Sequence, residues 1–345
     1  MKLENILVTG GFGYVGSRLT PHLLQHGYHV RVIDLNLYGD YGLEALEKTL
    51  TPEQKTRFEF IRADIRDPEA VSTAVKGMDA VIHLAAISND PTGEIDETLT
   101  RQVNFDAVGL LLCQAKEKKL KRFINASSSS VFGIKNDSNV SEDLEPEPLT
   151  FYSKYKMLSE WLVVAAADCE FTSVNIRPAT ICGFSPRQRF DLTVNKLTAD
   201  AVQKKVITVH GGQQRRPNVG MTDVVNLYAR LLDVDTKLIN GRTFNFGFEN
   251  LKVIEIANLI RSELGALNVE IKVTPTKDNR DYHISSQKII EVLGYEPISS
   301  ISAEVQSLRK VLESNHFGEV DSDQYYNMKI MKLGRSAAPY RFLSR

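Results

Sequence analysis

The segment FYSKYKMLSEWL places Tyr152 four residues before Lys156, so both side chains share one face of the helix that this segment predicts. An unperturbed tyrosine has a pKa of about 10 and is a poor base at neutral pH. A neighbouring ammonium favours the phenolate and brings the pKa of the phenol closer to the working pH. An exposed pair without a catalytic role would have the same spacing. Tyr155 is the residue directly before Lys156 and faces another side of the helix. In a dinucleotide-binding fold, the pair indicates a general base that removes a hydroxyl proton.

Two further polar features suit this chemistry. The segment NASSSSVFG, about twenty residues upstream, follows a run typical of a strand, and one of its hydroxyls is suited to holding the oxygen that loses its proton. The segment TGGFGYVGSRL spaces Gly10, Gly13 and Gly16 as a tight strand-to-helix turn requires. A side chain at the first glycine would obstruct the turn, one at the second would keep a pyrophosphate away, and one at the third would disturb helix packing. The N-terminus of the helix that follows attracts phosphate. We therefore expect a dinucleotide at this turn.

Acidic and small residues end the following strands. Asp34 lies eighteen residues after Gly16 and is expected to accept hydrogen bonds from the adenosine ribose, which favours NAD over NADP. Asp64 is either a partner of the adenine amine or the N-cap of the next helix. The segment HLAA, which ends at Ala86, suits a backbone that passes close to a cofactor, although small residues also pack well in a sheet.

Alternating strand and helix patterns must position these residues. Strands are expected to begin at Asn5, His29, Phe58, Asp79, Arg122 and Phe171, with helices between them, such as residues 15–25 and 98–118. This alternation of strands and helices predicts an α/β fold, with a Rossmann-type doubly wound parallel sheet and a smaller C-terminal substrate-binding lobe. Further helices are expected near residues 192–204, 253–264, 286–293 and 303–313.

The expected division of the chain is as follows. Residues 1–180, with a re-entry at about 218–250, form the NAD-binding domain. Residues 181–217 and 251–315 form, approximately, the substrate lobe, and residues 316–345 are a tail of no assigned role.

Composition excludes several classes of protein. The chain has 345 residues and a net charge of −1, which argues against a nucleic-acid or polybasic membrane partner. Three cysteines, Cys113, Cys169 and Cys182, show neither disulfide nor metal spacing, so reduced thiols and no metal site are expected. With no leader pattern and no long apolar stretch, a soluble cytoplasmic protein is expected.

Taken together, TGGFGYVG, Asp34, HLAA, the serine run before VFG and the Tyr152–Lys156 pair resemble the extended short-chain dehydrogenase/reductases, and more narrowly the NAD-dependent nucleotide-sugar epimerases and dehydratases. The resemblance implies that Ser128, Tyr152 and Lys156 are catalytic and that the enzyme is a homodimer, paired through residues 98–118 and 152–167. Within one subunit, these helices would equally well cover the sheet. The expected cofactor contacts are Gly10, Gly13, Tyr14, Val15, Gly16, Asp34, Asp64, Ile65, Leu84, Ala85, Ala86, Asn104, Tyr152, Lys156 and Pro178.

The same resemblance implies a nucleotide-diphosphate-sugar substrate. RRPNVGMTDVV and NRDYHISSQ resemble the segments that supply diphosphate-binding arginines, here Arg216 and Arg280, although a surface role for either arginine is equally compatible with the sequence. SPRQRFDLTVN resembles a segment covering the nucleotide, with Asn195 as the expected contact and Arg187 or Arg189 as further candidates. The expected substrate contacts are Ser128, Ser130, Tyr152, Thr180, Asn195, Arg216 and Arg280.

The predicted reaction is oxidation of the sugar C4 hydroxyl by hydride transfer to NAD. The 4-ketosugar then receives the hydride on its other face, as in a 4-epimerase, or leaves the enzyme, as in a nucleotide-sugar or nucleotide-heptose 4-dehydrogenase. A 4,6-dehydratase is less favoured because Ser129 and Ser130 stand where that branch carries Asp-Glu. A 3,5-epimerase is disfavoured because that branch has a cysteine at the place of Ser130. A non-catalytic NAD-binding sensor and an NADPH-preferring ketoreductase are the remaining alternatives.

Overall fold

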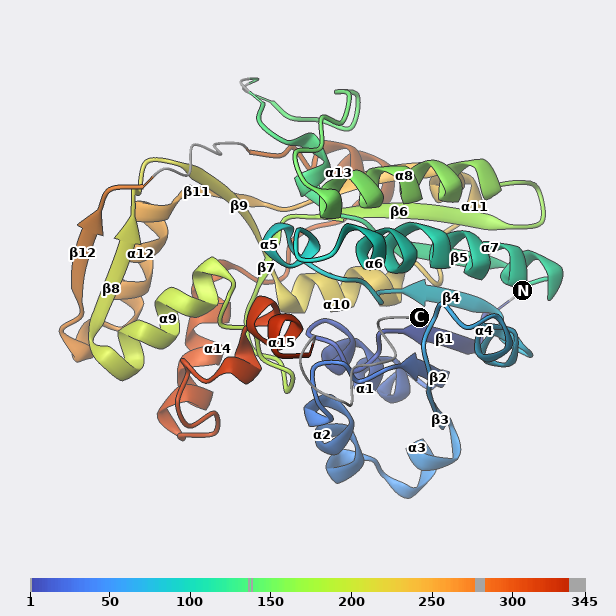
Figure 1. The fold of residues 1–345 in the computed structure, drawn as a ribbon, viewed down its shortest axis with the longest axis horizontal. Helices are drawn as coiled ribbons and strands as arrows, with labels where there is room; N and C mark the ends of the chain where they lie inside the picture. Colours follow the sequence, from blue (N-terminus) through green and yellow to red (C-terminus); the bar gives the residue numbers. More distant parts are fainter. Residues whose placement is uncertain (1, 136, 138, 277–282, 335–345) are drawn as a thin grey trace.

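The computed structural model describes residues 2–135, 137, 139–276 and 283–334. Its largest element is a seven-stranded sheet in the order β10-β6-β5-β4-β1-β2-β3, in which every pair is parallel (Figure 1). The strands are β1 (Asn5–Thr9), β2 (His29–Asp34), β3 (Phe58–Arg62), β4 (Ala80–His83), β5 (Arg122–Ala126), β6 (Thr172–Pro178) and β10 (Arg242–Phe246). This confirms the predicted Rossmann-type parallel sheet.

Both faces of this sheet are covered by helices, because its central strands alternate apolar side chains between two cores. Ile6 and Val8 pack with α1, α10 and α13, whereas Leu7 packs with α4, α7 and α8 on the other face. The helices of the first layer are α1 (Gly16–Gln25), α2 (Tyr41–Thr49), α10 (Met221–Arg230), α11 (Thr236–Ile239) and α13 (Gln287–Leu293). The helices of the second layer are α4 (Pro68–Val75), α6 (Glu97–Arg101), α7 (Ala107–Glu117) and α8 (Phe151–Ala166).

The expected helix over residues 98–118 is divided. A π-helical turn, η1 (Gln102–Asp106), separates α6 from α7, and a single-turn helix, α5 (Asp90–Gly93), precedes them. The short helix α3 (Pro52–Thr56) lies at the far edge, before β3. On α8, the side chains of Trp161 and Val164 point outward, with 59% and 42% of their surface exposed. The pairing of these helices in a homodimer stays a prediction.

The smaller lobe has its own core. Its strands β7 (Thr180–Cys182), β9 (Arg215–Gly220) and β11 (Glu249–Lys252) form one sheet, and β8 (Val206–His210) pairs with β12 (Glu270–Thr274) in another. The helices α9 (Thr193–Lys204), α12 (Val253–Glu263) and α14 (Ile301–Glu313) pack together over these strands (Figure 1).

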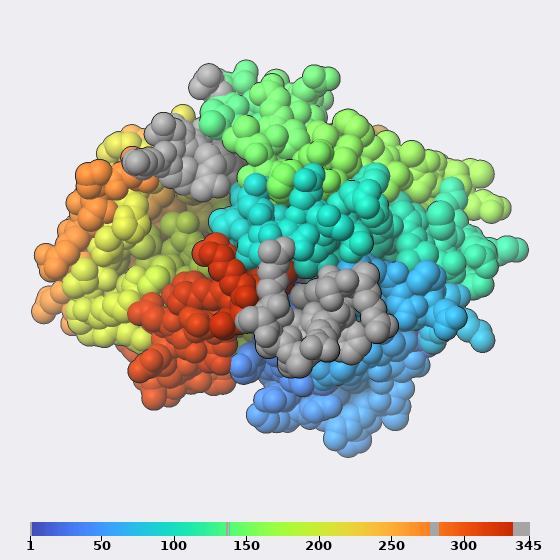
Figure 2. Space-filling view, in the orientation of Figure 1, coloured from blue at the N-terminus to red at the C-terminus, as the bar shows by residue number. Residues whose placement is uncertain are grey.

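The C-terminal segment, for which no role was predicted, packs against both cores. Phe317, Val320 and Tyr325 are buried in the lobe core, and Met331 of α15 (Asn327–Gly334) is buried with the second layer of the main sheet. Helix α15 also contacts α5. In Figure 2 the red residues of this segment fill the space between the lobe and the cyan helices of the main domain. The segment therefore joins the two lobes over the cleft between them.

None of the helices in the described ranges has the length and apolar character needed to cross a bilayer.

Candidate active site

A cavity of about 460 Å³ opens at the carboxyl ends of the central strands, where parallel sheets of this kind bind ligands. Most of the predicted site residues line it, although they come from segments far apart in the chain. These are Gly10, Gly13, Tyr14, Val15, Gly16, Asp34, Asp64, Ile65, Leu84, Ala85, Ala86, Ser128, Ser130, Tyr152, Lys156, Pro178, Thr180 and Arg216. The topology thus gathers the glycine turn, the tyrosine–lysine pair and the serines around one space.

The glycine turn is tight for a steric reason. Gly10 has a φ of +71°, and a Cβ built on it would lie 2.7 Å from the backbone nitrogen of Ala85. At Gly16, a Cβ would lie 2.3 Å from the carbonyl oxygen of Gly10. Any other residue at either position would separate the turn from β4 or from its own helix. The turn therefore presents bare backbone to the cavity, as close approach of a diphosphate requires.

Asp34 lines the same cavity as the glycine turn. Its Oδ2 accepts a hydrogen bond from the amide of Phe12 at 2.9 Å, and its Oδ1 accepts one from the amide of Asn36 at 2.8 Å. Burial raises the pKa of this carboxyl, and the two amides oppose that rise. Each carboxylate oxygen has a second lone pair, so the group can still accept from ribose hydroxyls. Together with the bare glycine turn, this donor and acceptor set fits NAD.

Asp64 lies beside the same cavity, but the N-cap alternative for it is wrong. Helix α4 is capped by Asp67, whose Oδ1 accepts from the amide of Glu69 at 2.9 Å. Asp64 instead pairs with Arg66, with Nη2 and Oδ2 separated by 2.7 Å.

Tyr152 and Lys156 both line the cavity from α8, one turn apart. Thr150 caps the helix N-terminus and accepts from the amide of Ser153, which fixes the start of the helix and hence the direction of both side chains. Lys156 Nζ donates to the carbonyl oxygen of Ala126 at 2.7 Å. Burial lowers the pKa of Lys156 to about 8, and the nearby Glu160 carboxylate opposes this. Tyr155 does not line the cavity, because its hydroxyl donates to Glu97.

The four serines that follow β5 all line the cavity, but their side chains have different partners. Ser128 Oγ accepts from the amide of Ser130 at 3.2 Å, and both residues line the cavity. Ser127 Oγ donates to Glu160 Oε1, and Glu160 holds Arg177 through two bonds of 2.9 and 2.7 Å. Sequence reasoning missed Glu160 and Arg177. The spacing of Glu160, one turn after Lys156, was the available signal.

The side chains of two residues predicted as ligand contacts bond to protein groups in this structure. Asn104 does not line the cavity, because its amide pairs with both the amide and the carbonyl of Ile87, at 2.9 Å each. Asn195 is fully buried, accepts from the amide of Gly183 and donates to the Tyr14 hydroxyl and the Arg189 carbonyl. Both asparagines therefore hold loops of the site in place. Arg280 lies outside the described residues.

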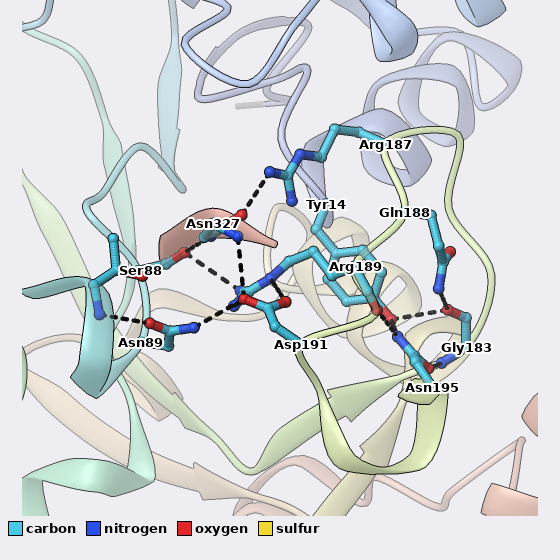
Figure 3. A network of polar contacts seen from close by, with 11 residues as sticks. Tyr14, Ser88, Asn89, Gly183, Arg187, Gln188, Arg189, Asp191, Asn195 and Asn327 are labelled. Carbon is cyan, nitrogen blue, oxygen red and sulfur yellow. Dashed lines mark hydrogen bonds and ion pairs between the residues drawn. The ribbon is translucent and has the colours of Figure 1, made fainter. Parts of the chain in front are cut away.

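The segment between β7 and α9 was only partly predicted as a site element. Its Ser185 Oγ donates to the carbonyl of Tyr14 at 2.7 Å, which docks the segment on the glycine turn. Arg187 and Arg189 line the cavity, together with Asn327 of α15 (Figure 3). Tyr228 of α10 is a further lining residue that sequence reasoning missed. Nothing in the local sequence pattern marks Asn327 or Tyr228, since only tertiary packing brings them to the cavity.

Comparisons with known proteins agree with this geometry. The family described as "NAD dependent epimerase/dehydratase family" matches residues 6–247. An uncharacterized UDP-glucose epimerase, YtcB of Bacillus subtilis, is 30% identical over 325 residues, which cover 91% of this chain and 99% of that protein. The human dTDP-D-glucose 4,6-dehydratase is 26% identical over 309 residues, which cover 85% of each chain.

Solved structures give the same result. UDP-glucuronic acid 4-epimerase from Bacillus cereus, in complex with UDP-glucuronic acid and NAD, matches with a TM-score of 0.79 and 28% identity, over 90% of this chain and 99% of that one. A glycine turn and an aspartate that line one cavity, together with a matching family, thus point to one cofactor. The chain belongs to the NAD-dependent epimerase/dehydratase family of enzymes, and its cofactor is NAD.

Proposed function

We propose that this enzyme is a nucleotide-diphosphate-sugar 4-epimerase that oxidises the sugar at C4 and reduces the resulting 4-ketosugar on its other face. The observation that carries the proposal is the convergence of Ser128, Tyr152 and Lys156 on the cavity that the glycine turn also lines. A base, an oxygen-holding hydroxyl and a cation around one space are what the removal of a hydride and a proton from a secondary alcohol requires.

Each residue has a role that follows from its chemistry. Tyr152 removes the proton of the C4 hydroxyl, and the Ser128 hydroxyl donates a hydrogen bond to the same sugar oxygen. Lys156 follows Tyr152 by one helical turn on the same face of α8, and its ammonium favours the phenolate. Gly10, Gly13, Gly16 and Asp34 hold the cofactor. NAD, when bound, supplies the acceptor for the C4 hydride.

The substrate side of the cavity supports a sugar nucleotide. Arg216 and Thr180 line the cavity from β9 and β7, which belong to the smaller lobe. A guanidinium suits bidentate contact with a diphosphate, so we assign this role to Arg216, and we propose the same for Arg280. The Bacillus cereus relative was solved with UDP-glucuronic acid, which favours a UDP-sugar as the first substrate to test.

A 4-dehydrogenase that releases the 4-ketosugar uses the same three residues and is the second candidate. A 4,6-dehydratase needs an acid and a base beside the catalytic serine, whereas this chain has Ser129 and Ser130, and Ser129 is buried. These two hydroxyls cannot supply the couple that removes the C6 hydroxyl and the C5 proton.

The proposal is tested by incubating the purified enzyme with UDP-, GDP-, dTDP- and CDP-sugars while NADH absorbance and product configuration are followed. A 4-epimerase gives the C4 epimer over many turnovers without accumulation of NADH. Stoichiometric NADH together with a 4-ketosugar product would replace the proposal by a 4-dehydrogenase. A 4-keto-6-deoxy product would replace it by a dehydratase. NAD binding with no turnover on any sugar of the panel would favour a sensor.

A further inference from the structure

Arg187, in the segment between β7 and α9, is a buried cation that forms no direct ion pair with a described residue, although the Asp34 and Asp191 carboxylates attract it from a greater distance. Only 2% of its surface is exposed, and no carboxylate of the described residues lies within ion-pair distance of its guanidinium. Its Nη2 donates to Asn327 Oδ1, and its Nε has no hydrogen-bond partner among these residues. Its guanidinium carbon lies 4.3 Å from the centre of the Tyr38 ring. A buried charge without a directly bonded anion is disfavoured, so this guanidinium is suited to bind one.

The neighbouring Arg189 shows the contrast. Its Nε and Nη2 bond to the two oxygens of Asp191 at 2.9 Å each, so its charge is already neutralised within the protein. Both arginines are buried in the same segment and line the same cavity. Arg187 is therefore the one of the two that is left for a ligand.

The position of Arg187 identifies the ligand group. Two residues before it, Ser185 donates to the carbonyl of Tyr14, inside the glycine turn. On its other side, the Tyr38 ring follows β2 and Asp34, which form the ribose side of the cavity. The guanidinium thus lines the same cavity as the turn that suits a diphosphate and lies near enough to the carboxylate that suits the adenosine ribose to attract it. In NAD, the negatively charged group between these two points is the diphosphate.

We propose that Arg187 binds the diphosphate of NAD and that Asn327 holds it in place, so that the smaller lobe and helix α15 complete the cofactor site. Asn327 is suited to this because its Nδ2 donates to Ser88 Oγ at 2.9 Å, beside β4, while its Oδ1 accepts from Arg187 (Figure 3). The C-terminal segment therefore has a function: it fixes a cofactor-binding arginine. The inference depends on the NAD cofactor and holds for an epimerase and for a dehydrogenase alike.

The test is ligand binding to cofactor-free full-length protein, with NAD, ADP-ribose and adenosine as probes in calorimetry. Arg187→Met removes the charge and should weaken NAD and ADP-ribose binding by about 10- to 100-fold, as expected for loss of a charge-assisted bond. Adenosine carries no phosphate, so its binding should change by less than about twofold. Asn327→Ala should give a smaller loss, about 2- to 10-fold, with the same selectivity.

Two further variants keep the result interpretable. Arg122→Met removes another buried arginine, which bonds to the carbonyls of Leu231 and Leu232 away from the cavity. It should lower the melting temperature and leave the affinity for NAD unchanged. Arg187→Met should instead leave the melting temperature of the cofactor-free protein equal or higher, while the shift produced by NAD becomes smaller. If Arg187→Met fails to fold, Arg187→Lys, which keeps the charge without the bidentate geometry, should give an intermediate loss.

Unchanged NAD affinity in Arg187→Met would overturn the proposal. An equal loss for adenosine and NAD would also overturn it, since that result would place the guanidinium at the nucleoside. A melting temperature that falls as in Arg122→Met, with no selective loss for phosphate-bearing ligands, would show a purely structural role.

Discussion

Lys156 Nζ lies 2.7 Å from the carbonyl oxygen of Ala126, the last residue of β5. This bond ties α8 to the strand from which the serine turn departs. It fixes the cation relative to Ser128 as well as to Tyr152, because Ala126 lies two residues before Ser128. The bond between Lys156 and Ala126 therefore links the helix that carries Tyr152 and Lys156 to the strand end that carries Ser128.

Tyr152→Phe removes the proposed base and leaves the ring in place. We expect turnover to fall by about 10² to 10⁴-fold, the usual contribution of a positioned base, with NAD still bound. Steady-state kinetics and the NAD content of the purified protein measure the two effects. Tyr155→Phe is the matched control, because its hydroxyl bonds to Glu97 away from the cavity, and its activity should stay within about twofold. Comparable activity in both variants would remove Tyr152 from the mechanism.

Lys156→Met is expected to abolish turnover and to change how stability depends on pH. Burial lowers the pKa of Lys156 to about 8, against 10.5 in an unfolded chain. Between these pH values the unfolded chain holds a proton that the folded protein has released, so the wild-type free energy of unfolding rises with pH. The rise is at most roughly 3 kcal/mol relative to Lys156→Met. Urea unfolding at pH 7.5 and 10 tests this, and parallel pH profiles would refute it.

Glu160→Gln breaks the buried pair with Arg177, in which both side chains are less than 10% exposed. The arginine is then left as an uncompensated charge, and we expect a loss of about 3–5 kcal/mol in the free energy of unfolding. The surface pair between Arg309 and Glu313 is the control, and Glu313→Gln should cost less than about 1 kcal/mol. Chemical denaturation measures both variants. Equal losses would show that burial does not matter for this pair.

His83 is predicted to contribute to acid sensitivity. Its pKa is lowered from 6.5 to about 3, first by burial and then by the nearby Lys156 charge. Below pH 6.5 the unfolded chain takes up a proton that the folded protein refuses, so the free energy of unfolding decreases as the pH falls towards 3. Between pH 7 and 4.5 this group accounts for about 2–3 kcal/mol.

His83→Phe removes this titration and suits the site, since the His83 ring lies 5.9 Å from Phe123. It also loses the bond to Thr9 Oγ1 at every pH, which shifts the stability by a constant amount. Urea unfolding at the two pH values should therefore show a smaller pH-dependent decrease for the variant than for the wild type. The same decrease in both proteins would contradict the assignment.

Much of the site could be predicted from local sequence because its chemistry lies in short motifs. The glycine turn, Asp34 and the tyrosine–lysine pair are each defined within a few residues, and the strand that precedes each one predicts where its side chains emerge. The structure departs from the predicted arrangement at Asn104 and Asn195, whose side chains bond to protein backbone and are not among the cavity-lining residues. An asparagine that contacts a ligand and one that bonds to backbone nearby look alike in sequence, and only the position of Ile87 or Gly183 distinguishes them.

By itself the sequence determined the parallel sheet, the cofactor turn and the helix face that carries Tyr152 and Lys156, because periodicity and turn chemistry act over short distances. Only the tertiary structure decided that the C-terminal segment packs across the cleft, that Arg187 is buried without a direct ion pair among the described residues, and that Glu160 joins Ser127 to Arg177. These outcomes depend on contacts between residues far apart in the chain, 140 positions for Arg187 and Asn327 and 239 for Ser88 and Asn327, and on the cost of burying charge. No local pattern encodes either of them.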